Sequence, residues 1–456
     1  MADKSGGLVL IYPLDTHTSR TYGANMDANV QRILSLQAVR EKSQIVFGLA
    51  KQGLLNHFDY HAERLDAAVD YVIGIIERDF GPDRYHEIPP HGRWQHFEVG
   101  GVPRVAELMK RWDELRYDNF EKVRSLIDLF FVSVLLDAGA GDRWSFREPD
   151  SGNIYTRSEG IAVASLYMFL NGDFANKDSP RKDVVHGEAL RDMSIETLYR
   201  GFQIDEDKNP LVGASARVEI IQKLGKSMLN HEDIFGPKGR PGLLVDCLTS
   251  TGGDKVDYSL LWSILQKTLI PIWPSDRTRI AGNLVGDAWP LSVLAKDRSI
   301  RTQPPETATI QPFHKLTQWL AYSLKVPFER LLSLSWTNAE LGTGLPEYRN
   351  GGLFVDMGVL TLKPEAMEKG LRISRSALPC FGAGDDEIVE WRAMTVALLD
   401  ELHQRILSSA RFGDVRLSLP QVLEAGSWKA GRELAAAKRP ETKSSPILNS
   451  GDGTLF

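Results

Sequence analysis

Four segments of the 456-residue sequence gather acidic, basic and aromatic side chains among glycines and prolines, outside any regular apolar pattern. Loops of this kind often carry binding and catalytic groups on a rigid scaffold. In the first segment, an apolar run over residues 129–136 meets Asp137 and then a glycine-rich turn that reaches residue 142. A carboxylate against an apolar helix end would have a raised pKa and could act as an acid or a base. It could equally cap the turn, which lacks the lysine and spacing of a phosphate-binding loop.

The second segment is Arg157-Ser158-Glu159-Gly160, which opens a stretch of small and apolar residues. The unpaired N–H groups at the start of a helix attract anions, so Arg157 and Ser158 could hold one there. Serine is also a frequent N-cap residue, and capping is the more common role.

The third segment, residues 272–320, contains Trp, Arg, Asp, His, Lys and Gln side chains within about fifty positions. This mixture is typical of a site where a polar ligand is stacked and hydrogen-bonded. A tryptophan-rich core seam with charges at its edge would have the same composition. The candidate site residues in this segment are Arg279, Asp287, Trp289, His314, Lys315 and Gln318.

The fourth segment, residues 344–356, contains Glu347 and Arg349 and ends at Asp356. On an extended chain, residues two apart point to the same side, so Glu347 and Arg349 would offer a carboxylate and a guanidinium to one ligand. They could instead pair with other groups of the protein.

The histidines do not predict a metal site. His57 and His61 lie four apart, which is the spacing of a two-histidine metal face on a helix, but no glutamate follows His57. The cluster of His86, His91 and His96 lacks helical register, and we interpret it as a surface feature. We therefore predict no metal and no other cofactor.

The composition predicts an ordinary globular protein. Hydrophobic residues make up 42% of the chain and charged residues 25%, and no apolar run is long enough to cross a bilayer. The short apolar stretch at residues 8–12 is ended by Pro13 without a cleavage site, and two cysteines are too few for a disulfide framework. The net charge of -6 disfavours nucleic-acid binding, although a small anionic ligand needs only one or two basic residues. We expect a cytoplasmic protein that binds neither nucleic acid nor a membrane.

Apolar residues recur at intervals of three and four along most of the chain, which predicts a mainly α fold. The expected helices span residues 29–55, 62–80, 105–115, 119–136, 159–170, 195–202, 214–229, 258–269, 314–324 and 386–408. Only residues 352–357 and 360–362 alternate like strands, and they predict a small β hairpin. We expect one helical catalytic domain over residues 1–437 and a polar tail, residues 438–456, that frays.

Several of these segments together resemble the uracil catabolism family, long described as a domain of unknown function. The strings that carry the resemblance are Arg157 to Gly160, residues 211–224, Gly286-Asp287-Ala288-Trp289, PFHKLTQWL over residues 312–320, and residues 344–356 with LPEYRNGGL. The resemblance covers nearly the whole chain. It implies a step in a pathway that opens the ring of a uracil nucleotide and releases urea from the ribosylurea that remains.

A weaker resemblance points to the queuosine salvage family, whose members are helical N-glycosidases with a DNA-glycosylase-like fold. The matching positions are Arg279 with Asp287 and Trp289, Lys315 with Gln318, and Glu390-Trp391-Arg392. In this register the family's catalytic aspartate falls on Phe313, and the tyrosine that follows it falls on His314. The resemblance implies a compact multi-helical body of the same kind, without the same catalytic carboxylate.

These resemblances imply hydrolysis of an N-ribosyl bond, which passes through an oxocarbenium-like centre that a carboxylate stabilises. We expect the carboxylate to be one of Asp137, Glu159, Glu347 and Asp356, with His314 as the acid. The basic residues expected to bind the ribosyl or ribosyl-phosphate substrate are Arg157, Arg279, Lys315 and Arg349.

Two alternatives remain open at this point. One is a non-catalytic ligand-binding or complex-forming protein of the same pathway. The other is amidohydrolysis, which needs a metal or an activated nucleophile, and neither cysteine has an evident histidine partner. The sequence predicts no oligomeric state.

Overall fold

The computed structural model describes residues 27–137 and 143–450, and helices dominate this part of the chain. The long helices are α2 (Leu36–Ala50), α3 (Leu65–Phe80), α5 (Arg104–Glu114), α6 (Asn119–Leu136), α7 (Arg157–Asn171), α10 (Ala214–Leu229), α13 (Tyr258–Leu269), α15 (Lys315–Leu332), α17 (Pro364–Ser374), α18 (Asp386–Leu407) and α20 (Trp428–Lys438). The short ones are α1 (Ala28–Ile33), α4 (Arg93–Phe97), α8 (Gly187–Arg191), α9 (Ile195–Gly201), α11 (Glu232–Phe235), α12 (Leu244–Thr249), α14 (Pro305–Ala308), α16 (Tyr348–Asp356) and α19 (Leu419–Val422). The predicted mainly α class is confirmed.

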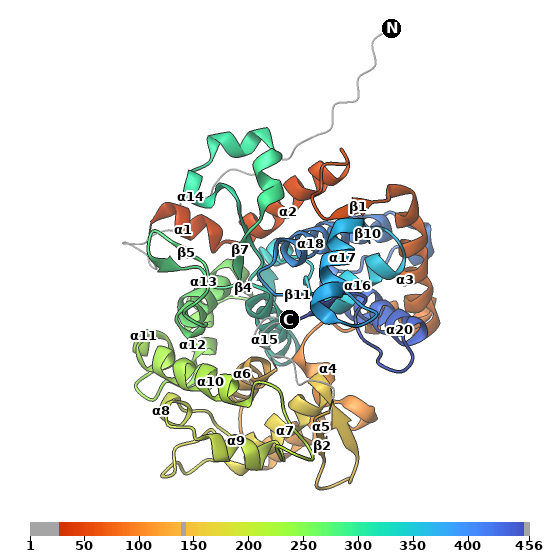
Figure 1. Ribbon diagram of the computed structural model, residues 1–456. Helices are drawn as coiled ribbons and strands as arrows, with labels where there is room; N and C mark the ends of the chain where they lie inside the picture. Colours follow the sequence, from red (N-terminus) through yellow and green to blue (C-terminus); the bar gives the residue numbers. More distant parts are fainter. Residues whose placement is uncertain (1–26, 138–142, 451–456) are drawn as a thin grey trace.

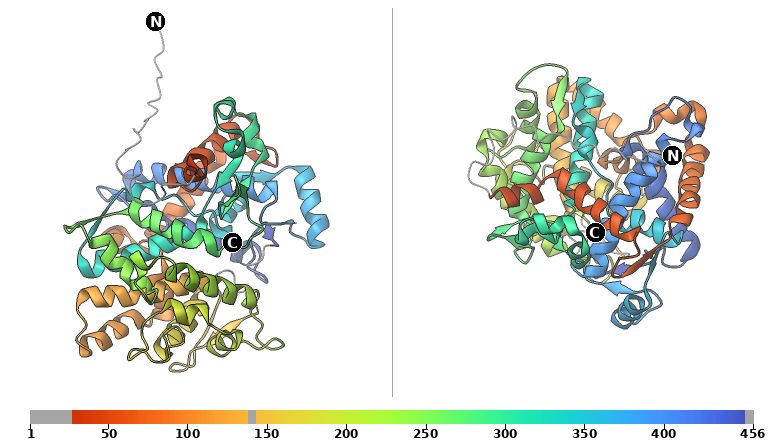
Figure 2. Two further views of the ribbon diagram at one scale, coloured as in Figure 1. Left: turned by 90° about the vertical axis from the view of Figure 1, so that its left-hand side faces the viewer. Right: turned by 90° about the horizontal axis from the view of Figure 1, so that it is seen from above.

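Helix α15 lies near the middle of the molecule in Figure 1, where it packs against α6, α13 and α4. Most of its side chains are buried. Helices α5 to α10 form the lower layer in the left view of Figure 2, drawn from orange to yellow-green. Above them α18 packs against α2, and α16 packs against α20 and α18, so the two ends of the described chain lie together. Helix α15 therefore packs against the lower layer mainly through α6.

The strands form six short pairs in the described residues. Four pairs are antiparallel: β1 (Phe58–Tyr60) with β10 (Leu360–Leu362), β2 (Ser145–Arg147) with β3 (Ile154–Thr156), β5 (Arg279–Ile280) with β6 (Asn283–Leu284), and β7 (Ala288–Pro290) with β8 (Ile310–Pro312). Two are parallel: β4 (Lys255–Asp257) with β9 (Ser335–Thr337), and β11 (Cys380–Phe381) with β12 (Leu448–Asn449). These pairs connect loops to one another and do not form a larger sheet.

The predicted β hairpin is wrong. Residues 348–356 form α16, because Glu347 caps the start of a helix and the apolar residues behind it face the core. Leu360–Leu362 is a strand, as predicted, but its partner Phe58–Tyr60 comes from the other end of the chain. A short alternating run does not reveal which segment it pairs with.

Capping residues determine where some helices begin, which apolar periodicity alone does not show. The predicted helix over residues 29–55 is two helices, because the Ser35 hydroxyl accepts a hydrogen bond from the Ala38 N–H (3.1 Å) and starts α2 anew. Likewise the Asp118 carboxylate accepts from the Glu121 N–H (2.8 Å) and starts α6. Helix α6 then runs to Leu136, and nearly all of its residues are buried.

Part of the predicted tail is packed against the body. Arg439 forms an ion pair with Asp356, Ile447 is buried, and β12 pairs with β11. Residues 451–456 lie outside the described part of the chain. Of the helices that the structure describes, none is both long and apolar enough to cross a membrane.

Candidate active site

The carboxylate of Asp287 fixes the start of α15. Strands β7 and β8 pair just beyond it, which brings Asp287 beside residues 313–315. The Arg392 guanidinium, from α18, donates to both carboxylate oxygens, at 2.8 and 2.7 Å. The indole N–H of Trp289 donates to Oδ1 (2.8 Å), and the backbone N–H of Lys315 donates to Oδ2 (3.0 Å). Burial alone would raise the pKa of Asp287, but Arg392 and these donors hold it well below its usual value.

His314, the predicted acid, contacts α1 and α13 instead of an ionisable partner. Its backbone is left-handed (φ 48°) and its N–H donates to the Asp287 carbonyl. The ring Nε2 donates to the Ile33 carbonyl (2.9 Å), and the ring packs against Trp262 with centroids 6.0 Å apart. Burial lowers the pKa of His314, so the ring stays neutral.

The Lys315 ammonium has no polar partner in the described part of the chain. Its Nζ makes no hydrogen bond or ion pair with any residue that the structure describes, and its aromatic contact is the ring of Trp319, 5.8 Å away. The side chain is partly exposed although protein surrounds it. Burial lowers the pKa of Lys315, and the carboxylates of Glu347 and Asp137 oppose that shift.

Glu347 is the N-cap of α16. Its Oε2 accepts from the Arg349 N–H (2.9 Å) and its Oε1 from the Asn350 N–H (2.5 Å). The segment is therefore not extended, and the predicted shared face of Glu347 and Arg349 is wrong. Glu347 is 7% exposed and forms no ion pair with any described arginine or lysine. Burial raises the pKa of Glu347, against the pull of its N–H donors and of Lys315.

Asp137 ends α6 and neutralises a buried arginine. The Arg93 guanidinium, fully buried, donates to Oδ2 (2.6 Å), and the Ser158 hydroxyl donates to Oδ1 (3.2 Å). Ser158 is therefore not the N-cap of α7. Thr156 takes that position, and Arg157 begins the helix with a left-handed backbone (φ 53°). The predicted turn after Asp137, residues 138–142, lies outside the described residues.

Glu159 lies in the first turn of α7, where the Arg432 guanidinium donates to its Oε1 (2.8 Å). The negative charge of Glu159 also opposes the lowering of the pKa of Arg93 and of His96 by burial. Asp137 and Glu159 therefore both lie near Arg93, the first residue of α4.

His91 and His96 are buried beside these carboxylates, which corrects their interpretation as surface residues. They are 4% and 7% exposed. The Nδ1–H of His91 donates to Glu424 (2.5 Å), and the rings of both histidines pack against Trp319 and Trp428. The sequence signal was the dense mixture of charged and aromatic residues in HGRWQHF, residues 91–97, which has no helical register to mark its buried side.

The other predicted residues lie apart from Lys315 and its neighbours or serve packing. Arg279 is exposed on β5 and donates to the Gly282 carbonyl (2.8 Å). The Gln318 side chain is buried against Thr343. Three more predicted residues have partners elsewhere: the Asp356 carboxylate binds Arg439, the Arg349 guanidinium donates to the Lys443 carbonyl (2.9 Å), and the Trp289 ring lies under Arg277.

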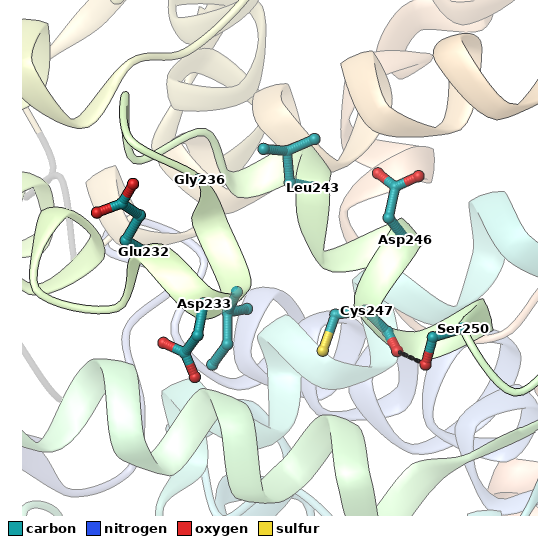
Figure 3. A pocket seen from close by; sticks show the side chains of 8 residues that line it. Glu232, Asp233, Gly236, Leu243, Asp246, Cys247 and Ser250 are labelled. Atoms are coloured by element: carbon teal, nitrogen blue, oxygen red, sulfur yellow. Dashed lines mark hydrogen bonds between the residues drawn. The ribbon is translucent and has the colours of Figure 1, made fainter.

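A separate surface hollow of about 400 Å³ lies between α11 and α12 (Figure 3). Glu232 and Asp233 stand on one side of it, and Asp246 and Cys247 on the other. It contains none of the predicted site residues and no basic side chain. Across residues 27–137 and 143–450, no three His, Cys, Asp or Glu side chains are grouped as a metal site would require.

The candidate active site is therefore the cluster of Asp137, Glu159, Lys315 and Glu347, with His91, His96 and Trp319 beside it. Three helix N-termini and the end of α6 supply the four charged residues. Arginines pair with Asp137 and Glu159, whereas Lys315 and Glu347 form no ion pair with a described residue and each acts on the pKa of the other. Such groups can transfer protons and bind a polar ligand in a water-poor interior.

The chain matches known proteins over almost its whole length. A family described as "Protein of unknown function (DUF1688)" matches residues 32–456. The chain is 44% identical over 446 residues to "Uracil catabolism protein 4" of Lachancea kluyveri, covering 94% of this chain and 100% of that protein. It is 46% identical over 434 residues to "Protein urg3" of Schizosaccharomyces pombe, covering 94% of this chain and 99% of that protein.

Replacing Asp287 by asparagine should strongly destabilise the fold, because it leaves the Arg392 charge buried beside a neutral amide. We expect the free energy of unfolding in guanidinium chloride to fall by about 3–5 kcal/mol. The control is Asp276→Asn, whose exposed carboxylate should contribute less than about 0.5 kcal/mol. Equal effects of the two substitutions would contradict the central role of Asp287.

The same pair predicts a pH dependence. Because the folded-state pKa of Asp287 is depressed, its contribution is complete above the unfolded value of about 3.9 and is lost as the pH falls through the folded value. The stability difference between the wild type and Asp287→Asn should be constant from neutral pH to about pH 5 and shrink below about pH 4. Unfolding curves across this range measure it, and a difference that grows in acid would refute the assignment.

Proposed function

The chain belongs to the DUF1688 family, and we propose that it is a hydrolase of uracil catabolism that cleaves the N-ribosyl bond of ribosylurea, or of its 5'-phosphate, to release urea. The name of the Lachancea kluyveri relative supports the pathway, and the likeness of residues 279–289 and 390–392 to helical N-glycosidases supports the reaction type. In this proposal the chain's own side chains supply the chemistry.

In this reaction the bond between ribose C1' and a urea nitrogen breaks. Water supplies a hydroxyl to C1', and the remaining proton ends on the urea nitrogen. Positive charge develops at C1' on the way, which a nearby carboxylate stabilises, and a base is needed to take the proton from water. Urea leaves poorly unless a hydrogen-bond donor assists it.

The observation that carries the proposal is that neither the buried Glu347 nor the partly exposed Lys315 forms an ion pair with a residue that the structure describes, although each acts on the pKa of the other. The three other predicted carboxylates are bound by guanidinium groups, from Arg93, Arg432 and Arg439. An arginine-bound carboxylate is a weak base and its charge is already compensated. Glu347 can both stabilise the positive charge at C1' and take the proton from water. Backbone N–H groups fix its position, and burial raises its pKa.

Lys315 supplies the cation for the ribosyl part of the substrate. An unpaired ammonium with a lowered pKa can donate to the ribose hydroxyls or to a 5'-phosphate. His314 has no part in this scheme, because its Nε2 is already bonded to the Ile33 carbonyl. The proton for urea comes from the water that Glu347 deprotonates.

Replacing Glu347 by glutamine should strongly lower urea release while keeping one of the two cap hydrogen bonds, because the amide has one oxygen that accepts and its NH2 group does not. We expect kcat to fall about 10²-fold or more, as for loss of a general base. The control is Asp257→Asn, which alters the carboxylate cap of α13 (Ser259 N–H, 2.9 Å) outside the site and should keep full activity. Full activity of Glu347→Gln, measured as urea release from ribosylurea, would refute the proposal for Glu347.

Replacing Lys315 by methionine removes the ammonium and keeps the length of the side chain. Loss of a charged hydrogen bond is worth about 1.5–3 kcal/mol, so we expect kcat/KM to fall about 10- to 100-fold. Comparing ribosylurea with its 5'-phosphate shows what Lys315 contacts, because a phosphate contact makes the loss larger for the phosphorylated substrate. An unchanged kcat/KM for both would exclude Lys315 from the site.

The competing function is a protein that binds the ligand without turning it over. Purified protein mixed with ribosylurea, with and without its 5'-phosphate and with and without a chelator, separates the alternatives. Urea release that the chelator does not affect supports the proposal. Binding without urea release supports the competing function, and release that the chelator stops supports metal-assisted chemistry.

A further inference from the structure

Two histidine rings and two tryptophan rings pack together beside Lys315. His91 lies 6.5 Å from Trp319 and 6.1 Å from Trp428, and His96 lies 5.7 and 6.2 Å from the same two rings, between centroids. Each histidine therefore contacts both tryptophans. We call His91, His96, Trp319 and Trp428 the aromatic quartet.

The quartet has hydrogen-bonding atoms that the described part of the protein leaves unused. The indole N–H of Trp319 is buried and has no acceptor. The Nδ1–H of His91 donates to Glu424, and that of His96 donates to the Gly92 carbonyl (3.3 Å). Because the pKa of His96 is lowered, its ring is neutral and its Nε2 is an acceptor, and this Nε2 has no partner among the described residues. The quartet thus presents the Trp319 N–H as a donor and the His96 Nε2 as an acceptor.

Burial favours a neutral His96 and lowers its pKa. The Arg93 guanidinium adds to this shift, and the carboxylates of Glu159, Glu424 and Asp137 oppose it. Glu424 belongs to a π-helical turn, Leu423–Ser427, that leads into α20. Such turns are rare and are frequent at functional sites.

We infer that the aromatic quartet binds the planar ureido group of the substrate. A ureido group has a carbonyl oxygen that can accept from the Trp319 N–H and an N–H group that can donate to the His96 Nε2. A carboxylate has no N–H group to offer this acceptor. This inference rests on the proposed function and deepens it.

The position of the quartet agrees with the proposed ribosyl site. Trp319 follows Lys315 by one turn of α15, and the Lys315 ammonium lies 5.8 Å from the Trp319 ring. The Lys315 ammonium and the Trp319 ring of the quartet therefore lie on the same face of α15. The Trp319 N–H is also the donor that urea needs as a leaving group.

N-methylurea is the probe, and its binding to the full chain is measured by saturation-transfer NMR. Trp319→Phe keeps an aromatic ring and removes only the N–H donor, so we expect binding to weaken about 5- to 10-fold. The matched control is Trp94→Phe, because the Trp94 N–H is also buried without an acceptor but belongs to a ring that contacts Phe130 and Arg330. It should bind like the wild type. Thermal unfolding of both variants checks that they fold.

Equal binding by the two variants, or no binding of N-methylurea to the wild type, would overturn the inference. Tetramethylurea, which has no N–H group, should bind more weakly than N-methylurea, and equal binding would also overturn it.

The same measurements distinguish a failure of this inference from a failure of the proposed function. If N-methylurea binds as expected but ribosylurea is not cleaved, only the function is wrong; if urea is released while Trp319→Phe keeps its KM and its affinity for N-methylurea, only this inference is wrong.

Discussion

The buried ion pair of Asp287 and Arg392 connects the parts of the structure that the candidate site needs. It joins α18 to the loop before β7, and the same carboxylate holds the first N–H of α15. Two buried charges are costly unless they are paired and hydrogen-bonded. Here each oxygen of the Asp287 carboxylate accepts two hydrogen bonds, Oδ1 from Arg392 and Trp289 and Oδ2 from Arg392 and the Lys315 N–H. Because this arrangement tolerates little displacement, the start of α15 is fixed relative to the second half of the fold.

The position of α15 in turn decides which side chains meet. Lys315 and Trp319 are four residues apart and lie on one face of the helix. That face meets Glu347 of α16, Asp137 of α6 and the histidines around α4. Arginines neutralise most of the carboxylates. Among the described residues, the Glu347 carboxylate has backbone N–H donors and no cation partner, and the Lys315 ammonium and the Trp319 N–H have no hydrogen-bond partner. Polar groups without partners are costly in an interior, which is a physical reason to associate them with a ligand.

Part of this cluster could be predicted from the sequence and part could not. Asp137, Glu159 and Glu347 lie in glycine-containing segments, and Lys315 lies in a segment that mixes aromatic and charged residues, all of which are local features. His91 and His96 were misjudged, because a short helix such as α4 has too few residues to show an apolar period. Arg279, His314 and Asp356 share the local signs of the others, but their neighbours in space are Gly282, Ile33 and Arg439.

The sequence by itself determined the helical class, the bounds of most long helices and the loops that carry charge, because apolar periodicity and turn residues act over a few positions. Only the tertiary structure decided which charged groups are paired and which remain free. Arg93 and Asp137 are 44 residues apart, and Asp287 and Arg392 are 105 apart. Burial and ion pairing depend on distances in space between such residues, and no local pattern contains that information.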